Sequence, residues 1–240
     1  MTMKCRIEAM RALAYSVAAS LDIGRHHPDC ETRMRQRSRL ALLVPVVKAW
    51  STDQGVEIAS MGVQIHGGAG YIEETGAAQH YRDARITPIF EGANGIQALD
   101  LVHRKVLGDH GAVARELMDE MRTFVCSGNE IDGDGALEEA IGSLQRATDW
   151  ILANGMPRAG AGATPYLELF GIVVGGYLMA RSASIALSRL ADADSEGTFY
   201  RAKIATAEFY ATNVLPKASG LERAATSGAE SLIAMAEDAL

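Results

Sequence analysis

Apolar residues recur every three or four positions through most of the chain, which is the spacing of one buried face on an α-helix. The first such stretch predicts a helix over residues 2–22, and a second, longer pattern predicts a helix that continues to about residue 65. Gly24 and the run His26-His27-Pro28 separate the two. Pro45 is expected to kink the second helix, because proline lacks the backbone donor that a helix interior uses.

The rest of the chain continues the helical pattern, with glycine, proline and polar runs between the helices. Pro88 predicts an extended approach to its next helix, Thr164-Pro165 resembles a helix start, and Pro216 is expected to end the last long helix. No stretch alternates with the period of two that a half-buried strand shows. The predicted fold is all-α, an antiparallel helical bundle followed by a second one. The further helices are expected over residues 75–83, 96–108, 113–125, 136–153, 165–190 and 197–215.

Composition indicates a soluble globular protein. Of 240 residues, 48% are hydrophobic and 22% are charged, with a formal net charge of −7, which argues against nucleic acid as a partner. Three dispersed cysteines favour reduced thiols in a cytoplasmic protein, with neither a disulfide framework nor a metal site. The longest apolar run, over residues 169–180, is too short for a membrane span. Gly171-x-x-x-Gly175-Gly176 in the same region predicts close packing of two helices.

One stretch, over residues 64–97, places a glycine-rich loop ahead of a single carboxylate. The loop reads Gln64-Ile65-His66-Gly67-Gly68-Ala69-Gly70, and the carboxylate belongs to Glu91. Glu91 follows the apolar run Ile86-Thr87-Pro88-Ile89-Phe90 and precedes Gly92, so we expect it at a turn from the core into a helix start. Burial there would strip the carboxylate of water and tune it as a general base near neutral pH.

Both motifs, in this order, resemble those of the acyl-CoA dehydrogenase flavoproteins. Their C-terminal helical domain has a Gln-x-x-Gly-Gly-x-Gly loop and then a Tyr-Glu-Gly-Thr turn, which here reads Phe90-Glu91-Gly92-Ala93 after Arg82-Asp83-Ala84-Arg85. The later helices resemble the extra C-terminal domain of the longer bacterial members, including those acting on 3-methylmercaptopropionyl-CoA. The resemblance covers the whole chain. It implies a partial acyl-CoA dehydrogenase C-terminal domain over residues 1–108 and the extra helical domain over residues 109–240.

The resemblance also implies the chemistry, which is FAD-dependent α,β-dehydrogenation of an acyl-CoA thioester. Glu91 would remove the α proton while a hydride passes from the β carbon to flavin N5, and Gly92 would leave room for the acyl chain. Positions that contact FAD in the family, partly from the neighbouring subunit, are matched by Gln64, Gly67, Gly68 and Asn94. The implied partners are the acyl-CoA substrate, electron-transfer flavoprotein, and further copies of the chain in a homodimer or higher homo-oligomer.

Several features depart from the family pattern. Ala93 replaces the usual threonine and Phe90 the usual tyrosine, and Gly95 stands where many relatives have glutamine. The family's N-terminal helical domain, its middle β domain, and the helix whose arginine reaches the FAD pyrophosphate have no counterpart. We therefore expect the sequence to be the C-terminal part of a longer enzyme, with Met1 as an internal methionine.

Simpler interpretations stay open beside these. Glu91 would also suit a helix start as a charge that complements the helix dipole, and the double glycine would suit a helix end followed by a turn. His66 and His80 are more typical of structural histidines than of acids or bases. The whole chain would alternatively be a non-catalytic helical module for oligomerisation, or a truncated remnant that binds no flavin alone.

Overall fold

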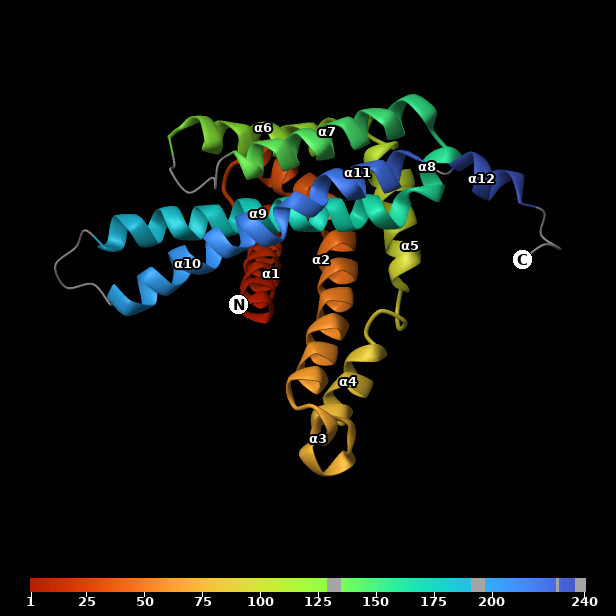
Figure 1. The fold of residues 1–240 in the computed structure, drawn as a ribbon. Coiled ribbons are helices and arrows are strands. Elements are labelled where there is room, and N and C mark those ends of the chain that lie inside the picture. The colour runs from red at the N-terminus through yellow and green to blue at the C-terminus, as the bar shows by residue number, and fades with distance from the viewer. Residues whose placement is uncertain (129–134, 191–196, 228, 236–240) are drawn as a thin grey trace.

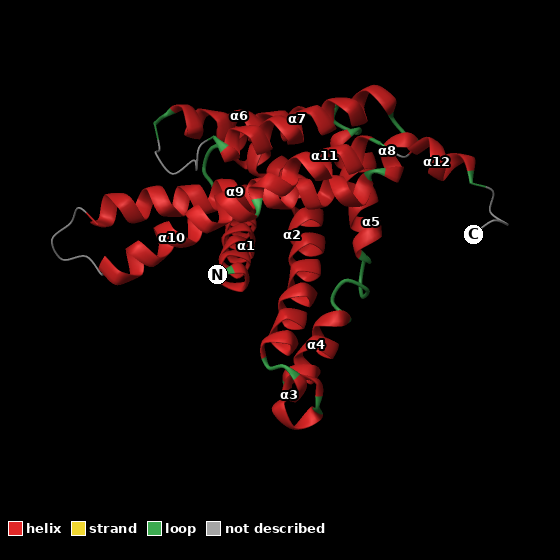
Figure 2. Ribbon diagram, in the orientation of Figure 1, coloured by secondary structure: helices red, strands yellow, loops and turns green. Residues whose placement is uncertain are grey.

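The structure is a computed structural model that describes residues 1–128, 135–190, 197–227 and 229–235. Within these ranges the chain forms helices joined by turns and loops, without a β-strand (Figure 2). The all-α fold predicted from the sequence is therefore confirmed.

The described elements follow one another along the chain as short and long helices, and two of the long ones exceed 25 residues. Their order is α1 (Thr2–His26), α2 (Cys30–Ile65), α3 (Gly68–Tyr71), η1 (Glu73–Thr75), α4 (Ala77–Arg85), α5 (Asn94–Leu99), the π-helical segment η2 (Asp100–Val106), α6 (Ala112–Cys126), α7 (Ala136–Asn154), α8 (Arg158–Ala161), α9 (Ala163–Leu190), α10 (Gly197–Asn213), η3 (Leu215–Lys217), α11 (Ala218–Thr226) and α12 (Ala229–Ala234).

The helices form a body from which one long arm projects. In Figure 1, α9 lies with α6, α7, α10 and α11 in the body, and α1 and α2 run crosswise to α9. The C-terminal half of α2 extends beyond the body together with α3, η1 and α4, and we call these four segments the arm. Helix α5 and η2 lead from the arm back into the body. The arm therefore carries the glycine loop, and the connection between α4 and α5 carries Glu91.

Helix α9 forms the centre of the core because small residues let other helices approach it closely. A Cβ atom added at Gly171 would overlap the indole ring of Trp50 on α2, and one at Gly175 would meet Trp50, Ala9 on α1 and Tyr210 on α10. Trp50 is only 1% exposed. The close packing predicted from the glycine spacing is confirmed, and it joins α9 to the first half of the chain.

Helix α9 is also long and apolar enough to span a membrane by length and composition alone. Its apolar stretch is longer than the run seen in the sequence. However, 78% of the relevant window is buried against other parts of the protein, and α9 contacts α1, α2, α5, α7, α10 and α11. This burial is that of a core helix.

A polar network also joins the two halves of the chain. Arg39 on α2 forms an ion pair with Glu120 on α6, and the hydroxyl of Tyr177 on α9 donates a hydrogen bond of 2.9 Å to the same carboxylate. Burial alone would raise the pKa of Glu120, but the hydrogen bond and charge of Arg39 outweigh it and hold the pKa below its usual value. Burial and the neighbouring Glu120 raise the pKa of Tyr177 to about 12.

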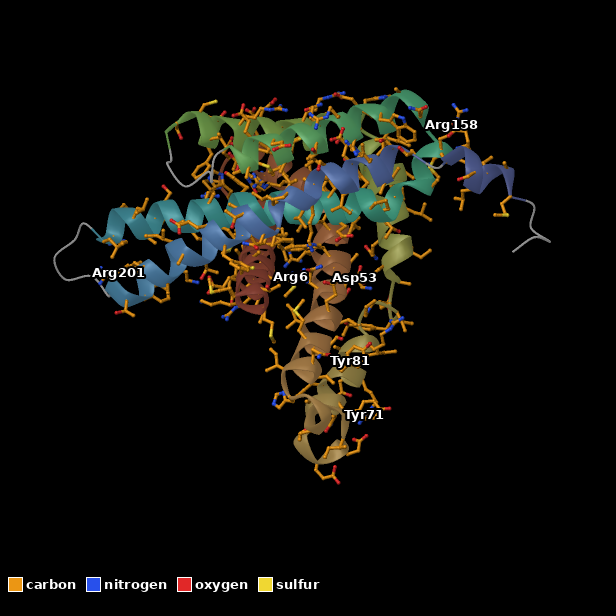
Figure 3. All side chains as sticks on the ribbon, viewed as in Figure 1. Arg6, Asp53, Tyr71, Tyr81, Arg158 and Arg201 are labelled. Carbon is orange, nitrogen blue, oxygen red and sulfur yellow. The ribbon has the colours of Figure 1, made fainter. Side chains whose placement is uncertain are left out.

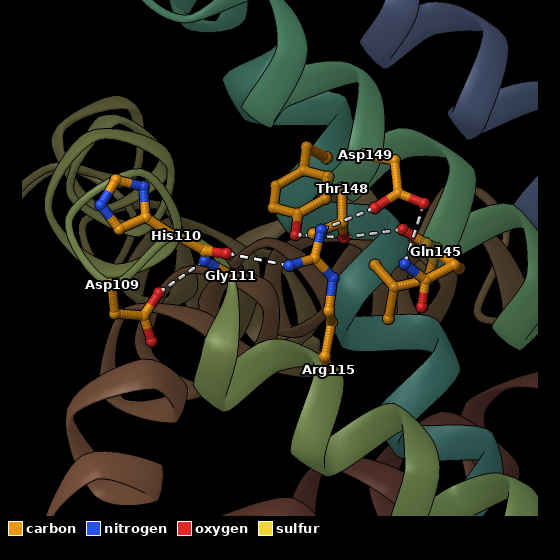
Figure 4. Close-up of polar contacts among 9 residues, drawn as sticks. Asp109, His110, Gly111, Arg115, Gln145, Thr148 and Asp149 are labelled. Carbon is orange, nitrogen blue, oxygen red and sulfur yellow. Dashed lines mark hydrogen bonds and ion pairs between the residues drawn. The ribbon is translucent and has the colours of Figure 1, made fainter.

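The segment that follows η2 is held by its own polar contacts (Figure 4). The carboxylate of Asp109 accepts hydrogen bonds from the backbone N–H groups of Gly111 and Val113, so it satisfies donors at the start of α6. Arg115 forms an ion pair with Asp149 on α7 at 3.0 Å. These contacts fix α6 against α7 directly after the predicted domain boundary.

Most helix positions agree with the sequence prediction, and the differences have local causes. Helix α1 continues through Gly24, because the side chain of Arg37 packs there and donates a hydrogen bond of 2.8 Å to the Gly24 carbonyl. Thr164 was predicted as a helix start, which is wrong, since α9 begins at Ala163. Between the helices expected over residues 136–153 and 165–190 lies the short helix α8, and Pro216 is followed by α11 and α12.

We predict that Gly171→Ala destabilises the protein by about 1 to 3 kcal/mol, because the added methyl group has to displace the Trp50 ring. The matched control is Gly55→Ala on α2, where an added Cβ meets nothing within 4 Å. That control should be neutral or stabilising by up to about 1 kcal/mol. Urea denaturation measures both, and equal midpoints for the two variants would contradict the packing argument.

We also predict that Glu120→Gln weakens the acid sensitivity of the fold. Because the pKa of Glu120 is lower in the folded state, its stabilising contribution is present above the ordinary value of 4.5 and is lost as the pH falls through the folded-state pKa. The free energy of unfolding should therefore fall less steeply below about pH 5 in this variant than in the wild type. Glu116→Gln, which removes an exposed ion pair with Arg35, should keep the wild-type pH profile. Parallel profiles for all three proteins would refute this role of Glu120.

Candidate functional site

Glu91 lies in a tight turn between α4 and α5. The backbone N–H groups of Ile89 and Phe90 both donate to the carbonyl of Ile86, and Asn94 N–H donates to the carbonyl of Pro88 at 3.0 Å. The extended approach predicted for Pro88 is therefore wrong, because these hydrogen bonds fold the segment into successive turns. The expectation that Glu91 stands just before a helix start is confirmed, since α5 begins three residues later.

Glu91 has an unusual backbone conformation, with φ of 36°, and the following Gly92 has φ of 71°. Positive φ is strained for a residue with a side chain and is common for glycine. A Cβ added at Gly92 would also overlap the side-chain amide of Gln97, which donates a hydrogen bond to the Gly92 carbonyl. The turn itself thus requires glycine after Glu91. Positive φ at a non-glycine residue is typical of functional sites, where the surrounding structure maintains the strain.

The burial expected for Glu91 is not present. The side chain is exposed, and so are the apolar neighbours Ile89 and Phe90 that were expected to lead out of the core. The physical reason is the turn, which holds all three residues outside the helix packing of the body. The described part of the chain therefore positions Glu91 but does not remove water from its carboxylate.

Asn94 ties this turn to α2. Its side-chain amide donates hydrogen bonds to Asp53 Oδ1 at 2.7 Å, Thr52 Oγ1 at 2.9 Å and the Ala49 carbonyl at 3.1 Å. Its oxygen accepts a hydrogen bond of 2.7 Å from Lys48 Nζ. These bonds occupy the amide within the chain, so a direct contact between Asn94 and a nucleotide would require some of them to open.

Two residues of this cluster, Lys48 and Asp53, were not predicted as site residues from the sequence. The ammonium group of Lys48 also lies 5.8 Å from the centre of the Phe90 ring, so it contacts both ends of the Glu91 turn. Burial raises the pKa of Asp53, against the hydrogen bond from Asn94. The sequence did indicate them, because the polar residues Lys48, Thr52 and Asp53 lie close to the buried positions Ala49, Trp50 and Gln54 of the same helix.

The glycine loop lies at the far end of the arm, beyond α4 (Figure 1). Gly67 has φ of 60°, and a Cβ at Gly70 would overlap the Val63 carbonyl and the His66 side chain, so these two glycines serve the turn itself. Gly68 has negative φ, and a Cβ there meets nothing within 4 Å. Its open backbone is the part of the loop that the turn alone does not explain.

Other residues of the loop divide between structure and surface. His66 Nδ1 lies 2.8 Å from the Gly62 carbonyl, which fits a structural histidine. Gln64 is exposed and lines a hollow of about 340 Å³ together with Met61, Ile65 and the first residues of α1. The structure thus groups Gln64, Gly67 and Gly68 at the arm tip and groups Glu91, Gly92 and Asn94 near the body, with α4 between the two groups.

No set of three or more histidine, cysteine or carboxylate side chains within the described ranges is arranged to hold a metal ion. The three cysteines are free, with Cys5 buried and Cys30 and Cys126 exposed. The candidate chemistry therefore rests on Glu91 and on the open loop.

Two family models together account for nearly the whole chain. Residues 1–107 match the model described as acyl-CoA dehydrogenase, C-terminal domain, and residues 117–236 match the model described as acetyl-CoA dehydrogenase C-terminal like. The chain belongs to the acyl-CoA dehydrogenase family. The resemblance inferred from the two motifs is thereby confirmed.

Relatives in this family are similar along most of the chain. The 3-methylmercaptopropionyl-CoA dehydrogenase of Ruegeria pomeroyi is 40% identical over 96% of this chain and 40% of its own length. A butyryl-CoA dehydrogenase of Syntrophomonas wolfei is 28% identical over 99% of this chain and, again, 40% of its own length. The acyl-CoA dehydrogenase chain described here thus spans about two fifths of the length of these curated relatives.

Solved structures share the fold. The structure of ACDH-11 from Caenorhabditis elegans in complex with C11-CoA matches with a TM-score of 0.69 and 23% identity, over 88% of this chain and 34% of that one. The structure of an acyl-CoA dehydrogenase from Bacillus anthracis complexed with FAD also gives a TM-score of 0.69, with 13% identity, over 96% of this chain and 43% of that one. At these identities the likeness supports the helical architecture.

We predict that Asn94→Ala lowers the free energy of unfolding by about 1 to 3 kcal/mol, because it leaves Asp53 and Lys48 without their amide partner. Amide hydrogen exchange should also become faster in the first turn of α5. The control Asn213→Ala removes an exposed amide that bonds only within its own helix, and it should cost less than about 0.5 kcal/mol. Unchanged exchange at Ile96 and Gln97 in the Asn94 variant would show that Asn94 does not hold this turn.

Proposed function

We propose that the chain is the C-terminal part of an FAD-dependent acyl-CoA dehydrogenase in which Glu91 takes the α proton of an acyl-CoA thioester. One observation carries the proposal. In a chain 40% identical to a 3-methylmercaptopropionyl-CoA dehydrogenase, the motif carboxylate stands alone in a strained turn that hydrogen bonds fix to the body. A turn held in this way fixes the backbone that carries the carboxylate, and a defined position is the first requirement of a general base.

The geometry supports proton transfer to Glu91 through accessibility and position. Its exposed carboxylate is open to a substrate placed against the turn, and Gly92 adds no side chain on the approach. As the α C–H bond breaks, the carboxylate takes the proton and the bonding electron pair moves into the new α,β double bond. Bound FAD supplies the acceptor for the hydride that leaves the β carbon. We place the wall that shields Glu91 from water in the portion of the relatives that this sequence does not cover.

The loop at the arm tip fits the flavin nucleotide in one respect that the fold does not require. The backbone of Gly68 faces open space, so a nucleotide can approach it more closely than it can approach a residue with a side chain. Gln64 offers a side-chain amide beside it. We therefore assign Gln64, Gly67 and Gly68 to FAD, and we expect the flavin to belong to a neighbouring subunit because the loop lies far from Glu91 along the arm.

The surface of the arm favours assembly. Ile65 is 73% exposed and Tyr71 is 82% exposed, and Ile72 and Tyr81 are exposed as well (Figure 3). An exposed group of large apolar side chains is typical of an interaction surface. A homodimer or higher homo-oligomer would cover it. Electron-transfer flavoprotein as the electron acceptor, the domain boundary after residue 108 and a cytoplasmic location stay predictions.

A second candidate is a non-catalytic helical module that serves assembly and binds no flavin alone. Two observations favour it, since Glu91 is exposed in the described chain and the side-chain amide of Asn94 is engaged within it. The exposed arm would suit such a module equally well.

Glu91→Gln is predicted to keep flavin and to slow flavin reduction by acyl-CoA by about two to four orders of magnitude, since the amide keeps the shape but not the basicity. The variant is made in a polypeptide that supplies the portion which the relatives have and this sequence does not cover. The measurement is the loss of flavin absorbance near about 450 nm under anaerobic conditions.

The control is Glu74→Gln, an exposed carboxylate of the arm, which should leave the rate unchanged. Reduction of the Glu91 variant at the wild-type rate would rule out Glu91 as the base. A polypeptide of full relative length that stays colourless with added FAD would instead support the non-catalytic module.

A further inference from the structure

A cavity of about 350 Å³ lies where α2, the connection between α4 and α5, and the start of α9 meet. Figure 3 labels Asp53, one of its lining residues, close to the level at which the arm leaves the body. The polar part of the lining comes from both halves of the chain, and it includes Asp53, Gln54, Glu57, Arg85, Asn94 and Glu168. Asn94 belongs both to this lining and to the proposed dehydrogenation site, where it holds the Glu91 turn, but the argument below does not depend on that proposal.

Two of the three carboxylates that line the cavity have a hydrogen-bond or ion-pair partner, and the third has none among the described residues. Glu57 forms an ion pair with Arg6 on α1, and Asp53 accepts the hydrogen bond from Asn94. Glu168 makes neither a hydrogen bond nor an ion pair with any residue in the described ranges, although it is partly buried. Burial, and then the negative charge of Glu57, raise the pKa of Glu168. The lining also contains a cation, Arg85, which is exposed and whose charge acts to lower the pKa of Asp53.

One further polar side chain of the lining is more deeply buried and lacks a partner. Gln54 is 6% exposed, and its amide makes no hydrogen bond within the described chain. The ring of Trp50 also lines the cavity, but its unpaired indole nitrogen has almost no accessible surface, so a ligand there cannot reach it. Buried polar groups in proteins are nearly always hydrogen-bonded, because leaving one unpaired costs its full desolvation. The unpaired Gln54 amide and Glu168 carboxylate on one cavity therefore indicate a polar occupant.

We propose that this cavity binds an organic cation that also carries an acceptor oxygen, such as an amino alcohol or a lysine side chain with its own backbone carbonyl. The carboxylates of Glu168 and Asp53 are acceptors for an ammonium group, and the side-chain N–H of Gln54 donates to the acceptor oxygen. The short carbon chain of the ligand lies against Val56 and Leu167. A volume of this size is at the lower end for small-molecule sites, which agrees with a ligand of few atoms.

The first test is titration of the 240-residue chain with 4-amino-1-butanol, measured by calorimetry. Pentylamine, which lacks the oxygen, and 1,4-butanediol, which lacks the charge, are the matched probes. The amino alcohol should bind tightest and the diol should give no heat at millimolar concentration. Equal binding of all three, or no binding of any, would overturn the proposal.

Fluorescence locates the binding event. The chain has two tryptophans, so Trp150→Phe leaves Trp50 as the only one. Addition of 4-amino-1-butanol to this variant should shift the emission of Trp50 if the ligand occupies the cavity. Calorimetric binding without a change in Trp50 emission would place the ligand elsewhere and contradict the assignment.

Glu168→Gln tests the anionic partner. It should weaken binding of 4-amino-1-butanol by about tenfold or more, because a charge-assisted hydrogen bond is lost. The thermal midpoint should be kept or raised, since an unpaired buried charge is removed. Glu116→Gln, an exposed carboxylate on α6, is the control and should bind as the wild type does. Wild-type affinity in the Glu168 variant would refute the site.

A longer polypeptide separates the two sources of the cation. If a free small molecule is the natural occupant, 4-amino-1-butanol should bind equally well to the 240-residue chain and to a protein of the relatives' full length. If a lysine from another segment fills the cavity, the longer protein should lose this binding and Glu168→Gln should then lower its thermal midpoint. Both results retain the cation site and differ in its occupant.

Discussion

The packing of Trp50 against the glycine face of α9 is the contact on which the rest of the structure depends. It is the place where the first two helices meet the later bundle, and its ring occupies space that only glycine at positions 171 and 175 leaves free. Dispersion and burial of so large a side chain make it a strong anchor. Because α9 also contacts α5, the same packing sets where the connection between the arm and the body returns to the core.

From this anchor the chain builds two regions with different physical character. The body is closely packed, and ion pairs such as that between Arg39 and Glu120 fix the relative orientation of helices that are held together by apolar contacts. The arm leaves many large apolar side chains in contact with water and carries the open loop at its tip. The proposed catalytic turn lies at the border between them. The hydrogen bonds of Asn94 attach that turn to α2 at residues on both sides of Trp50, so the core sets the position of Glu91 although Glu91 itself lies outside it.

Elements that depend on local sequence pattern were predicted well, and elements that depend on particular hydrogen bonds or on packing were not. Helices α7, α9 and α10 were predicted within two residues at each end, because helical periodicity and capping are local properties. The turn over residues 86–90 and the short helices α8, α11 and α12 were missed, because hydrogen bonds within a few residues and packing against other helices decide them. The π-helical segment η2 has no distinct periodicity in a short window.

The candidate site shows the same division. Gly92 after Glu91 predicted a turn, and the structure has a turn at this position. The hydrogen bonds of Asn94 were not accessible to sequence reasoning, because their partners lie 41 to 46 residues away. Burial of Glu91 was inferred from Ile89 and Phe90, whose apolar character did not reveal on which side of the turn they lie.

The interlocked volumes of Trp50 and Gly171 have an evolutionary consequence. A side chain gained first at position 171 would overlap the ring, whereas loss of the ring first would leave a cavity. A methyl group at position 171 costs about 1 to 3 kcal/mol and truncation of a buried tryptophan costs about 3 to 5 kcal/mol, so the route that begins at position 171 is the more passable one. Substitutions at these two sites should therefore be correlated across the family, and the change at position 171 should precede the change at position 50.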